Sequence, residues 1–461
     1  EECEMTQKDE VIQTLKQICE PIKYKRTHYC NELSEELDSE TVILYGWVHK
    51  LRSLGKLKFV ILRDRSGLVQ ITVHKNKVSK DVFDRVEQLK IESAIVVKGK
   101  VVKNPQAPKK FEIIPEDIQL VSITKSAPPI DITEAVPANL DTRLDNRPLD
   151  LRKPRISAIF KIQSTISNAI RQYFHENSFI EIHTPKIVAE ATEGGANVFK
   201  VKYFEWDAYL AQSPQLYKQL MLVAGYDRVF EIAPAYRAEE HNTPRHINEY
   251  ISIDAEIAWI NSEEDVMRIL EKGVKFAIDS VLNKNKDELE LLGVEIKSPS
   301  VPFKRLKFTQ VVDMLRDEGK ELSYEDDLDT EGEKLLGKIM KERFNTELYF
   351  IKQYPEGVRP FYTMLDPEDP RYTRSFDLEF KGLEITTGGQ RIHDYDLLIE
   401  RIKAKNLNPK SFRFYAEFFK YGVPPHGGFG LGLERFTMKL LNLNNIREAT
   451  LFPRTRTRVT P

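Results

Sequence analysis

The chain has 461 residues, which is enough for roughly two to four domains of ordinary size and for a large buried core. Hydrophobic residues make up 41% of it and charged residues 30%, a composition that is typical of globular proteins and excludes bulk disorder and collagen-like structure. Lys plus Arg (69) nearly cancel Asp plus Glu (71), so a polyanionic partner would have to bind at local basic patches.

Cysteine use and hydropathy bear on the compartment. Cys3, Cys19 and Cys30 all lie near the N-terminus without C-x-x-C spacing, which fits neither a disulfide framework nor a structural zinc site. No run of ~18 apolar residues is present to span a bilayer, and residues 1–16 are too polar and acidic for a signal peptide. We therefore expect a cytoplasmic protein with no membrane partner.

The chain divides into four predicted parts. Residues 1–40 form an N-terminal extension with a short helical pattern, and residues 125–152 are a proline-rich linker or hinge. Between them, residues 41–124 carry five short β-rich runs that indicate a small barrel: 41–49, 58–64, 68–74, 94–102 and 111–121. Residues 153–461 are expected to form one large α+β domain, which opens with an amphipathic helix over 155–176.

Alternation within the barrel predicts which side chains face outward. If Val60 and Leu62 belong to the core, Phe59 lies on the opposite face together with Ile61, and Gln70 points outward from the next strand. An exposed aromatic ring beside an amide is how OB-folds stack and read unpaired bases. The alternative is an ordinary surface phenylalanine.

Three segments of the large domain occur in a characteristic order. A helix and a short strand end at Pro185, a charged loop over 237–246 joins two alternating strands, and the glycine-rich run 428–435 leads into a helix. Alone, a glycine-rich run is equally typical of a turn. Together the segments resemble the three signature motifs of class II aminoacyl-tRNA synthetases, and the barrel in front narrows the likeness to the subgroup that charges Asp, Asn or Lys.

Further segments resemble the aspartyl-tRNA synthetases of the archaeal and eukaryotic type, namely 191–195, 212–219 and 382–391. The resemblance covers about residues 41–461. It implies an OB-fold barrel followed by an antiparallel sheet flanked by helices, and a homodimer formed through the first motif. It also implies that L-aspartate is ligated to tRNA(Asp) through an aspartyl-adenylate at the expense of ATP, with Phe59 and Gln70 contacting the anticodon.

The resemblance also assigns the nucleotide site. Arg237 would clamp the α-phosphate, Glu239 would accept from the adenine amino group, and Arg435 would stack on the base; these three are the implied catalytic residues. The whole implied ATP-binding set is Arg237, Ala238, Glu239, Arg245, His246, Ile247, Glu384, Gly432, Leu433, Glu434 and Arg435. Without the motifs, Arg237 would read as a surface ion pair with Glu239 or Glu240.

The amino-acid and metal sites follow from the same likeness. Lys218 and Arg391 would hold the aspartate side-chain carboxylate, and Glu193 and Gln215 its ammonium group. The implied aspartate-binding set is Glu193, Gln215, Lys218, Arg237, Thr387 and Arg391. Glu384 and Thr387, with Asp377 through water, would hold Mg²⁺, since a hard cation takes oxygen ligands.

Two alternatives stay open. An asparagine enzyme of the same subgroup is disfavoured because an uncharged amide substrate needs no cation such as Lys218. An inactive paralogue that only binds RNA is disfavoured because Arg237, Glu239, Glu384 and Arg435 are all present. The sequence does not decide whether tRNA(Asn) is charged as well as tRNA(Asp).

Overall fold

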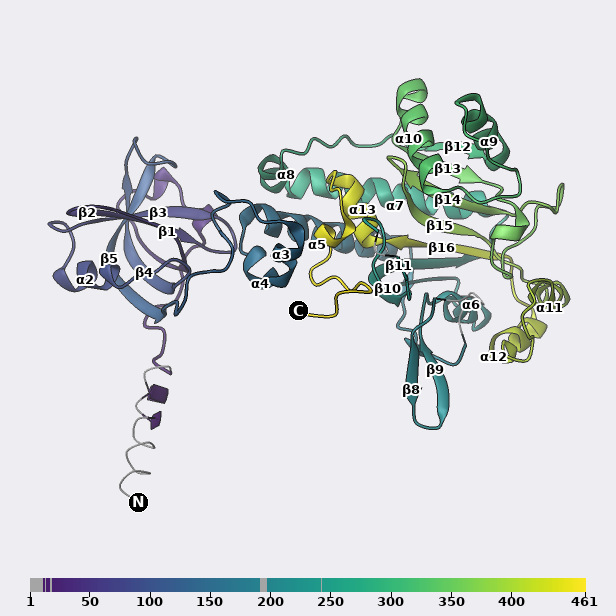
Figure 1. Ribbon diagram of the computed structural model, residues 1–461, viewed down its shortest axis with the longest axis horizontal. Coiled ribbons are helices and arrows are strands. Elements are labelled where there is room, and N and C mark those ends of the chain that lie inside the picture. The colour runs from purple at the N-terminus through teal and green to yellow at the C-terminus, as the bar shows by residue number, and fades with distance from the viewer. Residues whose placement is uncertain (1–10, 13, 17–18, 191–196, 242) are drawn as a thin grey trace, which may run out of the picture. The chain divides into compact units, whose positions relative to one another are not determined.

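The computed structural model describes residues 11–12, 14–16, 19–190, 197–241 and 243–461 (Figure 1). The chain forms two compact units, Glu1–Pro154 and Arg155–Pro461. Within the described residues, no helix has both the length and the hydropathy that crossing a membrane requires.

The first unit contains the predicted five-stranded barrel. Its strands are β1 (Thr41–Leu54), β2 (Leu57–Arg63), β3 (Leu68–His74), β4 (Ala94–Lys103) and β5 (Phe111–Ser122). They close in the order β1-β2-β3-β5-β4, in which β3 and β5 are parallel and the other neighbours are antiparallel. Helix α2 (Lys80–Glu87) packs against the barrel core through Val82, Phe83 and Val86. The barrel prediction is therefore confirmed, with strand bounds that shift by a few residues.

The segment before the barrel is more ordered than its mixed charges suggest. It holds two short 3-10 helices, η1 (Cys30–Glu32) and η2 (Glu35–Leu37). The Tyr24 hydroxyl donates to Asp117 Oδ2 on β5 at 2.9 Å, and the Lys23 backbone N–H donates to Gln119 Oε1 at 3.0 Å. The later half of the predicted extension thus covers part of the barrel surface.

The predicted linker contains two helices, α3 (Leu140–Asp145) and α4 (Arg147–Asp150). Pro148 sits in the first turn of α4, where a missing N–H costs no hydrogen bond. Asp150 is fully buried and pairs with Arg147 at 2.9 Å, Arg143 at 3.1 Å and Lys153 at 3.0 Å. Pro148 therefore marks a helix start, whereas Pro128, Pro129 and Pro137 lie outside the two helices.

The second unit is built on an eight-stranded sheet. Its strand order is β12 (Lys304–Lys307), β13 (Leu348–Lys352), β14 (Ser375–Phe380), β15 (Glu384–Gln390), β16 (His426–Gly432), β11 (Glu249–Ala258), β10 (Arg228–Tyr236) and β6 (Ile180–Glu181). The six strands from β13 to β10 are antiparallel, whereas β12 and β6 join the two edges in parallel. The expected α+β fold is confirmed, and the sheet is mixed rather than purely antiparallel.

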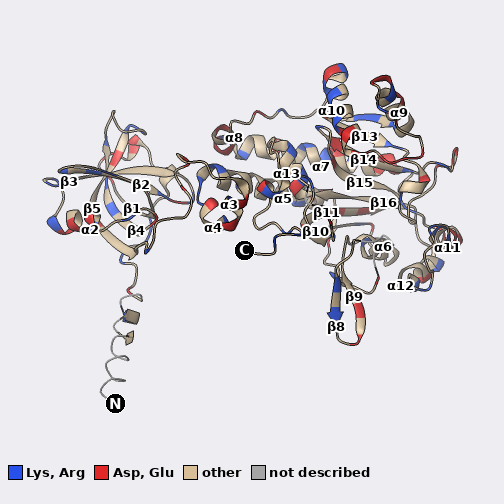
Figure 2. Ribbon diagram, in the orientation of Figure 1, with Lys and Arg blue, Asp and Glu red and all other residues tan. Residues whose placement is uncertain are grey.

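A smaller sheet has the order β7-β9-β8, from β7 (Ile187–Val188), β8 (Lys200–Tyr203) and β9 (Trp206–Leu210). Figure 1 shows the β8–β9 hairpin extending away from the large sheet. Strand β8 carries Lys200 and Lys202 and is blue in Figure 2.

One face of the large sheet is covered by the long helices α5 (Pro154–Glu176) and α7 (Glu263–Lys284). The apolar stripe of α5, which includes Ile162, Ile166 and Ile170, lies inside this core. The chain's own sheet therefore buries this stripe, so the dimer expected through the first motif rests on the motif likeness alone and stays a prediction.

The remaining helices form the other layers. Helices α6 (Gln215–Val223), α11 (Tyr395–Ala404) and α12 (Arg413–Ala416), with η4 (Glu417–Tyr421), share a second core. Helices α9 (Phe308–Asp317) and α10 (Thr330–Phe344) enclose a third core against β13. The other elements are α8 (Lys286–Leu292), α13 (Leu433–Leu440), η3 (Glu356–Val358) and η5 (Ile446–Ala449).

Candidate active site

The face of the sheet opposite α5 and α7 is hollowed by two adjoining cavities. Both are bounded by Arg237, Tyr362, Glu384, Thr387 and Arg391. Arg237 directly follows β10, Glu384 and Thr387 lie on β15, Arg391 directly follows β15, and Tyr362 lies between η3 and β14. Segments more than 150 residues apart in the sequence therefore meet at one site.

The charged loop supplies one wall of the first cavity. Strands β10 and β11 pair in unbroken register from Arg228 with Ile257 to Tyr236 with Glu249, and the Arg237 N–H closes the loop by donating to the Asn248 carbonyl at 2.9 Å. Arg237 and Glu239 line the cavity, as predicted, and the Arg237 guanidinium lies 5.7 Å from the centre of the Tyr250 ring. Ala238 is not among the lining residues; its N–H donates to the Asn197 carbonyl at 2.8 Å.

The returning arm of the loop lies across the same cavity. His246 lines it and has its Nδ1 2.6 Å from Thr243 Oγ1. Burial and the neighbouring Arg435 lower the pKa of His246, so its ring is neutral at pH 7. Ile247 is buried and forms an apolar part of the wall. Arg245 also lines the cavity, and it is held there by α10.

The glycine-rich strand β16 and the start of α13 form the opposite wall. A Cβ atom at Gly430 would lie 3.2 Å from Asp254 Oδ1, and one at Gly432 would meet nothing nearer than the Arg435 side chain at 3.8 Å. The two glycines keep this wall open, whereas side chains would project into the cavity. Arg435 donates through Nη1 to the Glu384 carbonyl at 3.0 Å and to Glu384 Oε2 at 3.3 Å.

The two residues before Arg435, Leu433 and Glu434, point their side chains in different directions. Glu434 lines the cavity, and its carboxyl group accepts from the Ile251 N–H at 3.1 Å. Burial raises the pKa of Glu434 to about 8, so the carboxyl group is neutral at pH 7. Leu433 packs into the main core and is not among the lining residues, since α13 turns its side chain toward the covered face of the sheet.

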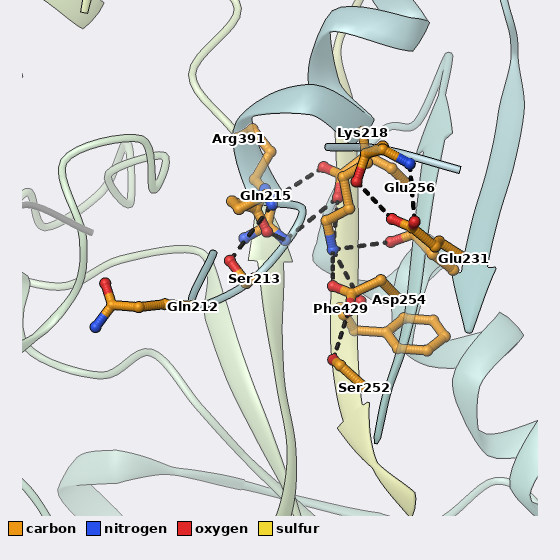
Figure 3. A network of polar contacts seen from close by, with 12 residues as sticks. Gln212, Ser213, Gln215, Lys218, Glu231, Ser252, Asp254, Glu256, Arg391 and Phe429 are labelled. Carbon is orange, nitrogen blue, oxygen red and sulfur yellow. Dashed lines mark hydrogen bonds and ion pairs between the residues drawn. The ribbon is translucent and has the colours of Figure 1, made fainter. Parts of the chain in front are cut away.

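Three of the residues expected to bind aspartate lie close together (Figure 3): Gln215 and Arg391 form part of the cavity wall, and Lys218 lies beneath the cavity floor. Gln215 and Arg391 line the first cavity, and Arg391 Nη2 donates to Gln215 Oε1 at 3.2 Å. Lys218 is 1% exposed and does not line either cavity. Its ammonium group lies 2.9 Å from Asp254 Oδ1, 3.3 Å from Glu256 Oε2 and 2.9 Å from the Phe429 carbonyl.

The expected convergence of Lys218 and Arg391 on one carboxylate does occur, but that carboxylate is Glu256. Arg391 Nε donates to Glu256 Oε1 at 2.9 Å, and Glu256 is fully buried. Burial opposes ionisation of Glu256, yet Arg391 and Lys218 outweigh it and lower the pKa of this carboxyl group. Of these two cations, Arg391 lines the cavity, whereas Lys218 supports the site from below.

The sequence reasoning missed three polar residues of β11. Ser252 and Asp254 line the first cavity, Ser252 Oγ donates to Asp254 Oδ2 at 2.5 Å, and Glu256 follows them beneath the floor. The signal was available, because Ser252, Asp254 and Glu256 are three polar residues at period two that alternate with apolar residues over 251–257. Glu193 lies outside the described residues.

The residues expected to hold a metal lie side by side on β14 and β15. Thr387 Oγ1 donates to Glu384 Oε1 at 2.7 Å, and Asp377 is the direct β-sheet partner of Thr387. Arg359, which sequence reasoning also missed, holds Asp377 with contacts of 2.6 and 3.1 Å. In the described part of the chain, no group of three or more His, Cys, Asp or Glu residues is placed to hold a metal ion.

The electrostatics of these carboxyl groups still suit a cation. Burial opposes ionisation of Glu384, but Arg435, the Thr387 hydroxyl and Arg237 outweigh it and lower its pKa. Burial raises the pKa of Asp377 to about 6, with Arg359 acting against this rise. Glu384 and Thr387 thus offer adjacent oxygen donors of the kind that Mg²⁺ prefers, while Asp377 is engaged by Arg359.

The barrel places Phe59 and Gln70 on one face, as alternation predicted. Val60 and Leu62 are fully buried, whereas Phe59 and Gln70 are half-buried on the outer side. Phe59 pairs with Thr72 and Ile61 with Gln70 across β2 and β3. The Gln70 amide contacts Thr72 Oγ1 and Glu112 Oε2, both at 3.3 Å. Glu112 is a further polar residue of this face that the sequence reasoning did not identify.

Comparisons with known proteins agree with this architecture. Residues 139–456 match the family of class II tRNA synthetases (D, K and N), and residues 42–121 match the OB-fold nucleic acid binding domain. The aspartate–tRNA(Asp) ligase of Pyrococcus furiosus is 54% identical over 436 residues, which are 95% of this chain and 100% of that protein. The aspartate–tRNA(Asp/Asn) ligase of Methanocaldococcus jannaschii is 50% identical over 440 residues, which are 95% of this chain and 99% of that protein.

Solved structures share the fold over nearly the whole chain. The asparaginyl-tRNA synthetase from Pyrococcus horikoshii, complexed with asparaginyl-adenylate, has a TM-score of 0.89 at 34% identity and covers 95% of this chain and 100% of that one. The aspartyl tRNA synthetase from Entamoeba histolytica has a TM-score of 0.86 at 33% identity and covers 96% and 95%. With an OB-fold barrel, a mixed sheet and a family match over residues 139–456, the chain belongs to the class II tRNA synthetases of the aspartate, lysine and asparagine subgroup.

Proposed function

We propose that the chain is an aspartate–tRNA ligase, which joins L-aspartate to tRNA(Asp) and converts ATP to AMP and pyrophosphate. The observation that carries this proposal is the similarity to a complete aspartate–tRNA(Asp) ligase at 54% identity. The cavity supports it chemically, because Arg237 and Arg435 lie within it beside the buried cation Arg391.

In the first step, an oxygen of the aspartate α-carboxylate attacks the α-phosphorus of ATP, and pyrophosphate leaves. In the second step, a hydroxyl of the terminal tRNA adenosine attacks the aspartyl carbonyl, and AMP leaves. Both steps concentrate negative charge, so fixed cations and precise positioning supply the rate without a protein nucleophile. Arg237 lines both cavities, as Glu384 and Thr387 do, and a guanidinium fork suits a phosphate better than an ammonium group does.

Selection of the amino acid falls to the wall formed by Arg391 and Gln215. A side-chain carboxylate and an amide have almost the same size, so charge must separate them. Arg391 has no acceptor atom, and an amide NH₂ group facing it would find no partner. Lys218, which lies beneath the floor, acts by neutralising Glu256 and Asp254 and leaves Arg391 available to the substrate.

ATP-dependent chemistry of this kind uses Mg²⁺, and we assign its binding to Glu384 and Thr387. Their oxygens lie 2.7 Å apart at the boundary of the two cavities, on the edge that faces Arg237. A bound Mg²⁺ would neutralise charge on the phosphates. Asp377 would contribute only through water, because Arg359 already occupies both of its carboxylate oxygens.

A second candidate function is the charging of tRNA(Asn) with aspartate as well. A relative at 50% identity is named aspartate–tRNA(Asp/Asn) ligase, which favours testing both tRNAs. Activation of asparagine itself is less favoured despite the 0.89 TM-score to an asparaginyl-tRNA synthetase, because Arg391 is a buried cation in the wall of the cavity.

We also propose a homodimer in the cytoplasm. Since the stripe of α5 is used internally, the support comes from the segment after it: Ile180 is 50% exposed on β6, an edge strand of the large sheet, and Ile187 is 47% exposed on β7. Obligate interfaces commonly bury more than ~2,000 Å². Light scattering at micromolar concentration should give twice the chain mass, and a monomeric mass would contradict the dimer.

The decisive experiment uses purified protein and four assays. Aspartate-dependent ATP–pyrophosphate exchange should be robust, and exchange with asparagine should be weaker by roughly two to four powers of ten, the range for sites that require a polar contact. Transcripts of tRNA(Asp) and tRNA(Asn) should then be charged with aspartate in parallel. Exchange with asparagine equal to that with aspartate, or no exchange with either, would refute the proposal.

A further inference from the structure

We propose that Glu333 of α10 is a positioning residue for ATP, which fixes Arg245 of the charged loop so that its guanidinium group faces the nucleotide cavity. The inference rests on the proposed function in that ATP is taken as the ligand. It adds a residue that none of the three motifs contains, since Glu333 lies 88 positions after Arg245 in the chain.

The contacts of Arg245 are divided between α10 and the cavity. Arg245 Nη1 donates to Thr330 Oγ1 at 2.8 Å, and Arg245 Nη2 forms an ion pair with Glu333 Oε2. The side chains of Arg245 and Glu333 are 17% and 7% exposed. Arg245 Nε is buried, so it is not open to the cavity. Nη1 and Nη2 each carry a second N–H group beyond the contact with α10, on a side chain that lines the cavity.

Helix α10 is a rigid support for this pair. Leu336, Ile339 and Met340 are buried in the core that α10 shares with α9 and β13. The helix also lies directly on the turn before Glu384: a Cβ at Gly337 would be 2.6 Å from Gly382 backbone atoms, so both positions need glycine. At the tip of the charged loop, by contrast, Glu240 and His241 are exposed, and the Glu240 carbonyl accepts from Arg456 Nη1 at 3.2 Å. Glu333, on a well-packed helix, therefore restrains the side chain of the loop residue Arg245.

The pair is expected to persist when ATP binds. Glu333 lines the second cavity and Arg245 the first, so the ion pair stands between the two. Breaking it would leave a buried carboxylate without a cation, which is costly. Each Nη carries two N–H groups, so a phosphate oxygen can instead accept from the N–H groups that do not face Thr330 or Glu333 while both of these contacts stay in place. The structure thus favours an ion pair that stays in place over one that must break when ATP binds.

This arrangement should favour ATP over AMP. Arg237 and Arg435 are two other cations of the same cavity, and they suffice for the smaller charge of a monophosphate. The triphosphate carries more negative charge and gains more from a third cation held at a fixed position. Loss of Glu333 would let the Arg245 side chain sample other rotamers, and ATP binding would pay the cost of ordering it.

The test is the Glu333→Gln variant, with ATP and AMP binding measured by titration calorimetry and aspartate-dependent exchange measured alongside. Burial raises the pKa of Glu333 to about 7, so the assays are run at about pH 8, where its carboxylate is charged. We expect the Kd and KM for ATP to rise about tenfold, the loss of one charge-assisted hydrogen bond. The Kd for AMP and kcat at saturating ATP should change less than about twofold.

Three further variants separate positioning from general damage. Glu331→Gln, on the same helix with a side chain that is 88% exposed, should bind ATP like the wild type. Glu333→Asp keeps the charge and should recover part of the affinity. Arg245→Met should weaken ATP binding, and adding Glu333→Gln to it should cause no further loss, because Glu333 acts through Arg245.

Several results would overturn the inference. Wild-type ATP affinity in Glu333→Gln would do so, as would equal losses for ATP and AMP or additive losses in the double variant. If Glu333→Gln does not fold, the test uses Thr330→Val, which removes only the Nη1 contact. This variant should raise the Kd for ATP several-fold, and an unchanged Kd would contradict the positioning of Arg245 by α10. Failure of the proposed function is seen separately, as absence of aspartate-dependent exchange in the wild type.

Discussion

Replacing Arg391 by Met tests how the site selects its amino acid. Arg391 is 5% exposed, lines both cavities and makes three hydrogen bonds: two to Glu256, at 2.9 and 3.4 Å, and one to Gln215 at 3.2 Å. Met has a similar length and no charge. The variant therefore removes the lining cation that contacts Gln215, while it keeps most of the side-chain volume.

The Arg391→Met substitution is expected to lower both the kcat/KM for aspartate and the stability of the fold. A hydrogen bond to a charged group contributes ~1.5 to 3 kcal/mol, so kcat/KM for aspartate should fall roughly tenfold to a hundredfold. The same change leaves Glu256, which is fully buried, with Lys218 as its remaining cation at 3.3 Å. Breaking one partner of a buried ion pair costs ~3 to 5 kcal/mol, so the variant should also unfold at lower denaturant concentration.

A second substitution separates these two effects. Adding Glu256→Gln removes the uncompensated carboxylate, so it should restore part of the stability of the Arg391→Met variant. It should not restore aspartate activation, because Glu256 lies beneath the floor and does not line the cavity. Thermal unfolding and aspartate-dependent pyrophosphate exchange are measured on the wild type, on Arg391→Met, on Glu256→Gln and on the double variant, with ATP binding as the control for the nucleotide half of the site.

Two outcomes would contradict the reasoning. Arg391→Met with wild-type kcat/KM for aspartate would show that Arg391 does not contact the substrate. Recovery of activation in the double variant would show that the loss arose from the stranded Glu256 carboxylate and not from the missing substrate contact. In either case the preference for aspartate over asparagine would need another source.

Three further predictions concern other parts of the molecule. Phe59→Ala should reduce tRNA charging at least several-fold, since a stacked base contributes ~1 to 3 kcal/mol, and should leave pyrophosphate exchange intact; equal losses in both assays would mean that the barrel had unfolded. Glu384→Gln should raise the Mg²⁺ concentration for half-maximal exchange roughly tenfold or more, and an unchanged Mg²⁺ titration would remove Glu384 as a ligand. Burial raises the pKa of Glu434 from 4.5 to about 8. Between these two pH values the native state therefore holds a proton that the unfolded chain has lost. The contribution of Glu434 to the stability of the wild type consequently falls as the pH rises across this range. Glu434→Gln cannot ionise and should lose less stability between about pH 5 and 9 in urea unfolding, by up to ~1.4 kcal/mol per pH unit, whereas parallel curves would disprove the assignment.

The sequence by itself determined the elements whose signals are local. Strand β10 begins and ends at the residues that alternation predicted, Arg228 and Tyr236, and Phe59 lies on the face opposite Val60 and Leu62. Side chains of a strand alternate with period two whatever surrounds them, so local order suffices for such predictions. The motif likeness likewise located the charged loop and the glycine-rich strand that line the cavity.

Only the tertiary structure decided how the charged side chains are paired. Lys218 was expected to contact the substrate, yet it lies beneath the floor with Asp254 and Glu256, and Arg245 is held by Glu333. The apolar stripe of α5 likewise belongs to the chain's own core. A residue type records that a group is charged or apolar, whereas its partner depends on which distant segments the sheet brings within a few ångströms. That proximity is set by long-range packing, and no spacing along the chain encodes it.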